Sequence, residues 1–241
     1  MTDILVWPHD LLIPAECRPN LVPFTRTGGR SLGGVKPSVR TDVGFWNVDY
    51  AGILLHNRAQ LRTWEAIKDI LGGSAGRIAV PVWTYRTAPN VSGDGVSYEA
   101  APAVPHDDDT SFSDGSLYEQ SSISIVTEGA VAIGATTITL RIIDAGEDLS
   151  GVFFSYEHAL YRTGQVIEVD GDVWTMRISP SIVAPIPDGA DLEFDLPTCL
   201  CNLDDDRGMD NGFNIDGNER IGVAFVQDTQ YWNLLAIGAE P

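Results

Sequence analysis

The alternation of hydrophobic and polar positions along most of the chain is typical of short β-strands. In VGFWNVDYAGI, Trp46, Val48 and Tyr50 occupy every second position, which is the period of a strand with one buried face. RIAVPVWTY (77–85) predicts another strand, and Pro81 places that strand at a sheet edge or a bulge because proline has no N–H to donate. These two segments predict a sheet in the first third of the chain.

One segment has the period of an α-helix instead. Asn57 is a good N-cap, and Gly72-Gly73 ends the segment. Between them the apolar positions recur at intervals of three and four residues: Leu61, Trp64, Ile67 and Leu71. The sequence therefore predicts one helix flanking the sheet.

The periodicity is lost between about 87 and 121, in a long connection rich in Pro, Gly, Ser and Asp. Six short strand-like segments follow within 122–197: SISIV, TTITLRI, VFFSY, ALYRTGQVIEV, VWTMRIS and DLEFDL. Asp170-Gly171 is a strong hairpin signal between two of them. We expect these segments to form a small closed barrel or sandwich.

Two further strands, in TCLCNLDDD and RIGVAFVQD, follow Pro197 and are expected to complete the first sheet. The interpretation is a mainly β protein in which 1–121 plus 198–241 form one domain and 122–197 form an inserted small β-barrel. The last stretch, TQYWNLLAIGAEP, has two readings: the last strand of the core, or an apolar tail that docks on a neighbour. Its apolar residues are Tyr231, Trp232, Leu234, Leu235 and Ile237.

Charge is distributed unevenly along the 241 residues, whose net charge is −19. Residues 1–97 contain ten Lys/Arg and eight Asp/Glu, whereas residues 98–241 contain five and 26. A chain this acidic excludes conventional DNA binding. It would suit the wall of a channel through which DNA passes without binding. The basic stretch is 20–42, which is expected to form two extended arms around a Gly-rich tip. Its cations are Arg26, Arg30, Lys36 and Arg40.

The catalytic motifs in the chain fail on their context. Gly29-Arg30-Ser31-Leu32-Gly33 matches the GxSxG string, but Gly34 and Pro37 follow where a nucleophile elbow needs a helix. The same stretch has Gly34 where a phosphate-binding loop needs lysine. PHDDDTSFSDGSLYEQ (105–120) combines His106 with four aspartates, but no apolar frame surrounds them that would shift their pKa values. We therefore expect an acidic connection there, and no enzyme.

The candidate metal ligands in the sequence do not have the spacing that known metal sites need. DDDRGMDNGFNIDG has no frame with the carboxylates, glycine and glutamate of an EF-hand loop, so acidic turns are expected. Cys17, Cys199 and Cys201 form no disulfide framework, and the four histidines are scattered. We expect free thiols in a reducing compartment and no cofactor or metal. The N-terminus lacks the basic residues of a secretory signal, and no apolar run is long enough to cross a bilayer.

Several blocks of the sequence resemble tail-tip proteins of long-tailed bacteriophages and related prophages, of the distal tail or minor tail type. They are RTGGRSLGGVKPSVRTDVGFW, LRTWEAIKDILGGSAGRIAVPVW, PHDDDTSFSDGSLYEQ, FSYEHALYRTGQVIEVDGDVWTMRISP and LPTCLCNLDDDRGMD. The resemblance extends over nearly the whole chain, apart from the last dozen residues. It implies a structural virion protein without enzymatic chemistry, made in the bacterial host cytoplasm.

The resemblance also implies a fold and partners. Such proteins have a tail-tube-like β-sandwich flanked by one helix, often with a peripheral small barrel. They form closed homo-oligomeric rings, typically hexamers, around the DNA channel, and they join the tail tube to the hub or baseplate. The candidate assembly residues are then those of the basic stretch and of the apolar C-terminus: Arg26, Arg30, Lys36, Arg40, Tyr231, Trp232 and Leu235.

Two other functions are compatible with parts of the sequence. The segment 122–197 could bind a host-surface carbohydrate or receptor through an aromatic stacking platform. Its aromatic candidates are Phe153, Phe154, Tyr156, Tyr161 and Trp174. A cell-wall hydrolase using acidic pairs is the other alternative, but the sequence offers no positioned acid and nucleophile.

Overall fold

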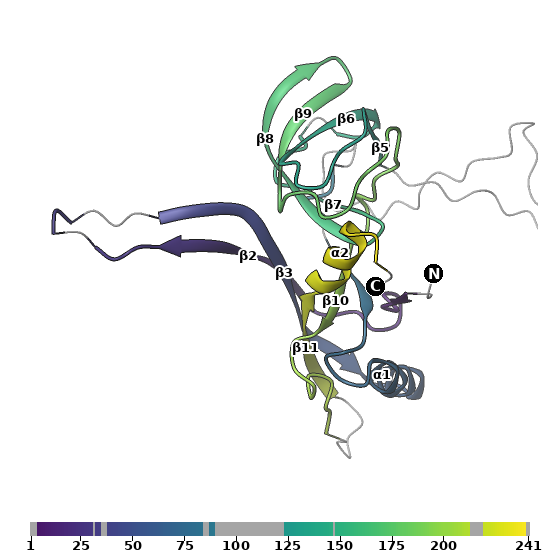
Figure 1. The fold of residues 1–241 in the computed structure, drawn as a ribbon. Coiled ribbons are helices and arrows are strands. Elements are labelled where there is room, and N and C mark those ends of the chain that lie inside the picture. The colour runs from purple at the N-terminus through teal and green to yellow at the C-terminus, as the bar shows by residue number, and fades with distance from the viewer. Residues whose placement is uncertain are drawn as a thin grey trace, which may run out of the picture.

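The computed structural model describes residues 4–30, 32–34, 38–83, 87–89, 123–146, 148–212 and 219–239, without the side chains of 26–27 and 38–42. Within these residues the protein is mainly β, with two curled sheets and one helix flanking the first of them, as the sequence predicts (Figure 1). The elements of the first unit are β1 (Leu5–Val6), β2 (Glu16–Thr27), β3 (Ser38–Leu55), α1 (Arg58–Leu71), β4 (Ile78–Pro81), β10 (Thr198–Leu203) and β11 (Glu219–Gln227).

The predicted alternation along β3 places a row of large side chains in the core. Trp46, Val48 and Tyr50 are all buried, because they share the face of the sheet that packs on the rest of the first unit. Trp7 lies among them and meets Tyr50 edge to face at 5.4 Å between ring centroids. Trp64 of α1 contacts Trp7 in the same way at 6.1 Å, so the helix closes this core.

The helix begins and ends where its capping residues predict. The Asn57 side chain accepts a hydrogen bond from the Gln60 N–H, and Gly72 ends α1 in the left-handed conformation at φ 57°. Three of the predicted apolar positions of α1, Trp64, Ile67 and Leu71, are buried; Leu61 is partly buried, and Gln60 is buried as well. This prediction is confirmed.

The six-stranded sheet has the order β1-β4-β10-β11-β3-β2, so the last two strands of the chain lie in its middle. β10 pairs with β4 and β11 pairs with β3, both antiparallel. The prediction that Pro81 marks an edge strand is wrong, since β4 lies between β1 and β10. Pro81 is tolerated because it ends β4 beyond the two-residue partner β1, which pairs only with Ile78 and Ala79.

The second sheet has the order β5-β6-β9-β8-β7 and forms a half-barrel. Its strands are β5 (Ser124–Thr127), β6 (Thr137–Asp144), β7 (Phe153–Tyr156), β8 (Ala159–Asp170) and β9 (Val173–Ser179). The prediction that DLEFDL (191–196) forms a strand is wrong. The segment makes isolated bridges, because it contacts two different strands in turn. The Leu192 N–H donates to the Ile125 carbonyl of β5 at 3.1 Å, and Glu193 exchanges two hydrogen bonds with Ser155 of β7. This irregular segment thereby links the two edges of the half-barrel.

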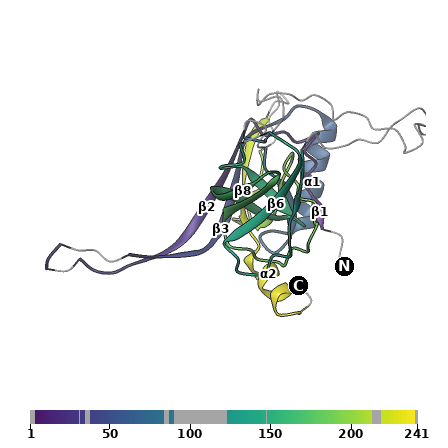
Figure 2. The ribbon, with the colours of Figure 1, turned by 90° about the horizontal axis from the view of Figure 1, so that it is seen from above.

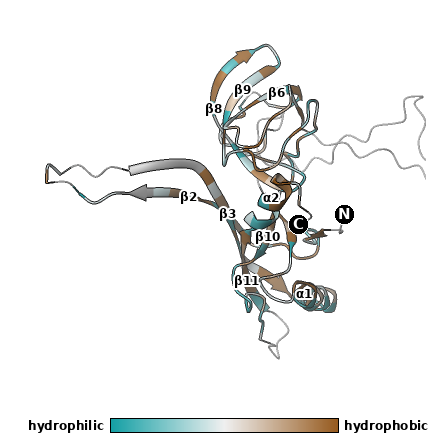
Figure 3. Cartoon of the chain, in the orientation of Figure 1, coloured by the Kyte–Doolittle hydropathy of each residue, from teal (hydrophilic) through white to brown (hydrophobic). Residues whose placement is uncertain are grey.

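The C-terminal stretch forms a helix, α2 (Thr229–Ala236), so its interpretation as a last strand is wrong. Asp228 caps the helix by accepting from the Tyr231 N–H at 2.9 Å. A short apolar run without alternation does not distinguish a strand from a helix, and here the capping aspartate decides. Figure 3 shows hydrophobic residues along the strands of both sheets and on α2, whose Trp232 packs in the half-barrel core.

Candidate assembly surfaces

The hairpin of β2 and β3 extends well beyond the sheet that it belongs to. β3 pairs with β11 only over Asn47–Leu55, whereas it pairs with β2 as far as Ser38. The arm, which we define as residues 22–45, is therefore a two-stranded ribbon for most of its length. The eight β3 residues 38–45 span about 25 Å at the rise of a strand. Figures 1 and 2 show this ribbon projecting away from the body in two perpendicular views.

An irregularity in the pairing lies where the ribbon leaves the body. Pro23 faces Gly44, but Thr25 already faces Arg40, so β3 has two more residues than β2 in this interval. Such a bulge bends a ribbon and increases its twist. Pro19 and Pro23 also remove N–H donors from β2, which is the edge strand of the sheet, and this disfavours strand addition along the edge.

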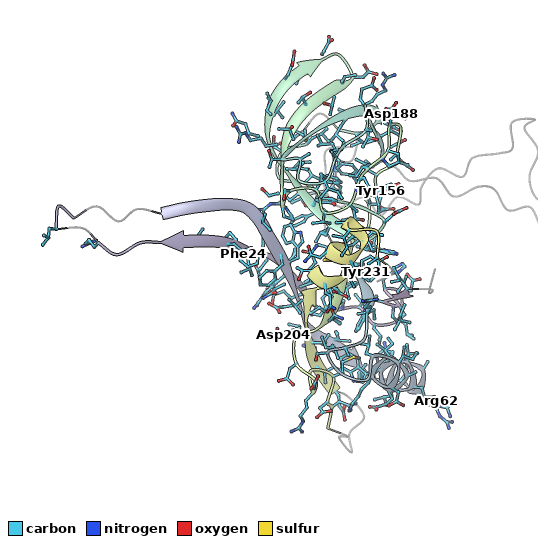
Figure 4. All side chains as sticks on the ribbon, in the orientation of Figure 1. Phe24, Arg62, Tyr156, Asp188, Asp204 and Tyr231 are labelled. Carbon is cyan, nitrogen blue, oxygen red and sulfur yellow. The ribbon has the colours of Figure 1, made fainter. Side chains whose placement is uncertain are left out.

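Apolar side chains lie exposed on the arm. Phe24 is 49% exposed and contacts Phe45 at 5.6 Å between ring centroids, and Val43 is 54% exposed. Phe45 and Val43 are two positions apart on β3, so they share a face of the ribbon. Two strands without a covering layer are marginally stable alone, and exposed apolar side chains on them favour contact with another surface. Figure 4 labels Phe24 on the arm.

The four predicted basic residues all belong to the arm sequence. Thr25 pairs with Arg40 and Arg26 pairs with Val39, which puts both arginines in the two-stranded ribbon. Arg30 is exposed near the turn, and Lys36 lies outside the described residues. Residues 22–45 carry four Lys/Arg and one Asp, so the arm is basic on an otherwise acidic chain.

The three predicted residues of the C-terminus lie in different surroundings. Trp232 is 3% exposed and belongs to the core of the half-barrel, so it is occupied within its own chain. Tyr231 is partly buried, and the Arg77 guanidinium lies over its ring at 5.2 Å from the centroid. Leu235 and Ile237 are exposed, so only the end of this stretch offers a surface for a neighbour.

Sequence reasoning missed the ion pair that fixes α2. Asp228 is almost fully buried, and its Oδ2 accepts from Arg77 Nε at 2.7 Å while its Oδ1 caps the helix. The Asp228 N–H also donates to the Leu200 carbonyl at 3.0 Å. An aspartate directly before the apolar run was the sequence signal, since aspartate is a preferred N-cap. The Asp228 carboxylate thus fixes α2 on the first unit, and Trp232 of α2 packs in the half-barrel core.

The acidic motifs have structural contacts where the structure describes them. Asp210 accepts from Lys68 Nζ at 2.8 Å and from Arg207 Nε at 2.7 Å, and these hydrogen bonds hold the pKa of its carboxyl below the usual value. The Met209 carbonyl accepts from Trp64 Nε1, so this loop closes over α1. Within the described residues no group of three or more His, Cys, Asp or Glu could hold a metal ion. The segment 105–120, with His106, lies outside them.

The aromatic residues proposed as a stacking platform do not share one surface. Phe154 and Tyr161 are fully buried, and Phe154 stacks on Phe194 at 5.3 Å in the half-barrel core. Phe153 packs against Trp46 of the first sheet at 5.5 Å. The remaining two, Tyr156 and Trp174, are only partly buried.

Two of the thiols, Cys17 and Cys201, are not activated as nucleophiles. Burial raises the pKa of Cys17 to about 11 and raises that of Cys201 well above its ordinary value. All three cysteines are free. The GxSxG string falls in the connection between β2 and β3, with Ser31 outside the described residues, and two strands rather than a strand and a helix flank it.

Comparison with known proteins adds no relative to these observations. No protein-family model matches the chain, and none of the curated proteins matches it significantly. Among the described residues, no helix is long and apolar enough to cross a membrane.

Proposed function

We propose that this protein is a structural component of a bacteriophage tail tip, where copies form a ring around the DNA channel that joins the tail tube to the hub. The observation that carries the proposal is the arm: a basic, two-stranded ribbon that bears exposed Phe24 and Val43 and leaves the body of its own chain. A ribbon of this kind gains stability when it contacts a neighbouring subunit. The sequence blocks that resemble tail-tip proteins supply the biological setting.

The charge of the chain supports the same assignment. A channel for DNA needs walls that the passing polyanion does not bind, and a chain of net charge −19 supplies repulsion. A head-to-tail contact between copies closes into a ring when its rotation permits, which makes one arm per subunit sufficient. In this role the protein catalyses no reaction and keeps its neighbours in a fixed arrangement.

The test is assembly of the purified protein, alone and with the adjacent tube and hub proteins, by native mass spectrometry and negative-stain electron microscopy. We expect a closed ring with a central hole. A protein that stays monomeric and binds neither neighbour would contradict the proposal.

A matched variant isolates the arm. Replacing residues 24–43 by Asn-Gly joins the paired positions Pro23 and Gly44 through a two-residue hairpin turn. Among the side chains of 24–43 that the structure describes, none belongs to either buried core, so the shortened protein should keep the circular dichroism spectrum and melting temperature of the wild type to within about 2 °C. We expect it to be folded and to form no ring.

A further inference from the structure

A second exposed surface lies at the far end of the half-barrel, where β8 turns into β9 beside the end of β6. Asp170 pairs with Val173, so Gly171 and Asp172 form the turn. The Ile142 N–H donates to the Asp172 carbonyl at 2.8 Å, which places the end of β6 against this turn. We define the acidic tip as Ile143 and Asp144 of β6 together with residues 167–172.

The acidic tip combines apolar and anionic side chains. Ile143, Ile167 and Val169 are 63%, 53% and 51% exposed. Its carboxylates are Asp144, Glu168, Asp170 and Asp172, all on exposed residues. In the part of the chain that the structure describes, none of these four carboxylates lies in an ion pair. Three exposed aliphatic side chains among these carboxylates, of which Asp172 also interacts electrostatically with Arg141, fit a partner that is apolar and basic.

The arm has both properties. It exposes Phe24 and Val43, and its sequence carries four Lys/Arg against one Asp. Arg26 and Arg40 stand on the paired strands, and Arg30 is exposed near their turn. Apolar contact between the two surfaces would supply affinity, while the opposite charges would fix orientation and raise the association rate.

Within the described residues, the arm does not contact the acidic tip of its own chain. In Figures 1 and 2 the ribbon leaves the body in a different direction from the β8–β9 hairpin. The two surfaces therefore meet only between copies, and each copy carries one of each. Such a contact is heterologous, which is the kind that propagates from subunit to subunit.

We propose that the arm of one copy docks on the acidic tip of the next copy. The proposal rests on the proposed function in taking a second copy as the partner. It assigns the half-barrel a role as the receiving surface of the assembly, in place of a ligand-binding role.

Sedimentation velocity at about 50 mM and at 0.5 M salt tests this contact with two charge-reversed variants. The tip variant is Glu168→Lys, Asp170→Lys, Asp172→Lys, and the arm variant is Arg26→Glu, Arg30→Glu, Arg40→Glu. Each alone should associate at least about tenfold more weakly than the wild type at low salt, because like charges then face each other. An equimolar mixture of the two should associate again, since each arm then finds a tip of opposite charge.

A control separates the contact from the change in net charge. Asp10→Lys, Asp69→Lys, Asp204→Lys shifts the charge as much as the tip variant does, at exposed positions of the first unit, and should leave association unchanged. Circular dichroism checks that all variants are folded.

The outcomes distinguish this contact from the proposed function. A tip variant that still forms rings as the wild type does would overturn the arm-to-tip contact and leave the ring proposal standing. Equal weakening by the control variant, or a mixture that stays dissociated, would also overturn the contact. A wild type that associates neither alone at low salt nor with tube and hub proteins would overturn both.

Discussion

The junction between the two units differs from the arm. Its side chains are packed within their own chain, whereas the arm keeps apolar side chains exposed. At the junction, Asp228 uses both carboxylate oxygens and its N–H, and Trp232 fills the half-barrel core from a helix that the same aspartate caps. On the arm, Phe24 and Val43 remain about half exposed on a ribbon of two strands. The difference separates a surface that is packed within the monomer from one that remains exposed, which is the surface that the proposed assembly would cover.

The largest effect is expected from Trp232→Ala. Removing this buried side chain leaves a cavity between α2 and the half-barrel, which should lower the free energy of unfolding by about 3–5 kcal/mol. Urea denaturation followed by fluorescence measures it. Ile237→Ala, just past the same helix and 78% exposed, is the control and should change stability by less than about 0.5 kcal/mol. Equal effects of the two would show that α2 does not join the units.

Asp228→Ala should cost somewhat less, about 2–4 kcal/mol. The variant loses a charge-assisted hydrogen bond from Arg77 and the N-cap of α2, but Arg77 is one-third exposed and stays partly solvated. Asp228→Asn keeps an acceptor for the cap and should fall between alanine and wild type in the same denaturation experiment. Asp204→Ala, on an exposed residue, serves as the control. A variant as stable as wild type would show that the Arg77–Asp228 ion pair does not stabilise the protein.

Changes in the arm should leave stability unchanged and weaken assembly. Replacing Arg26, Arg30, Lys36 and Arg40 by glutamate should leave the melting temperature within about 2 °C of the wild type, since Arg30 is exposed and Arg26 and Arg40 lie on the ribbon beyond the sheet. Assembly at low salt should weaken by at least about tenfold. Light scattering against concentration measures this. Unchanged assembly would show that the arm does not act electrostatically.

The smallest effect concerns pH and the turn between β7 and β8. His158 is half-buried with φ 69°, its Nδ1 lies 2.8 Å from Thr198 Oγ1, and its carbonyl accepts from the Leu200 N–H. Burial lowers the pKa of His158 below 6.5, while the adjacent Glu157 opposes the shift. Folding therefore favours the neutral imidazole, so this contribution is fully present above about pH 6.5 and is lost as the pH falls below it.

Melting temperatures between pH 5 and 8 test this contribution. His158→Asn keeps a residue that tolerates the left-handed backbone but removes the titration. The variant should lose less stability than wild type between pH 7 and pH 5.5. Identical slopes would exclude His158 as a source of the pH dependence.

The sequence predicts the elements whose signals are local. Asn57 and Gly72 mark the ends of α1, and the alternation at Trp46, Val48 and Tyr50 marks β3, because capping and side-chain period act within a few residues. The hairpin signal at Asp170-Gly171 likewise gave the β8–β9 turn. The basic stretch with its two extended segments predicted the arm.

What depends on distant partners was not predictable. The irregular bridges of Leu192 and Glu193 arise because β5 and β7 lie on either side of that segment, and no local pattern encodes this arrangement. The ion pair that holds the capping Asp228 comes from Arg77, 151 residues away. The apolar residues of the tip look like ordinary strand positions until the fold brings β6 beside the β8–β9 turn.

The placement of β10 and β11 in the middle of the first sheet sets an order of events during synthesis. The strands of the half-barrel are all synthesised by Ser179, although Trp232 joins their core only later, whereas β3 and β4 have no partner between them until Gln227 has emerged. The first strands to be made are thus among the last to be stabilised, and a nascent chain stalled before β11 exposes unpaired strand edges. A truncation that removes β11 should therefore leave β3 and β10 unpaired on one side, so that the protein aggregates or is degraded.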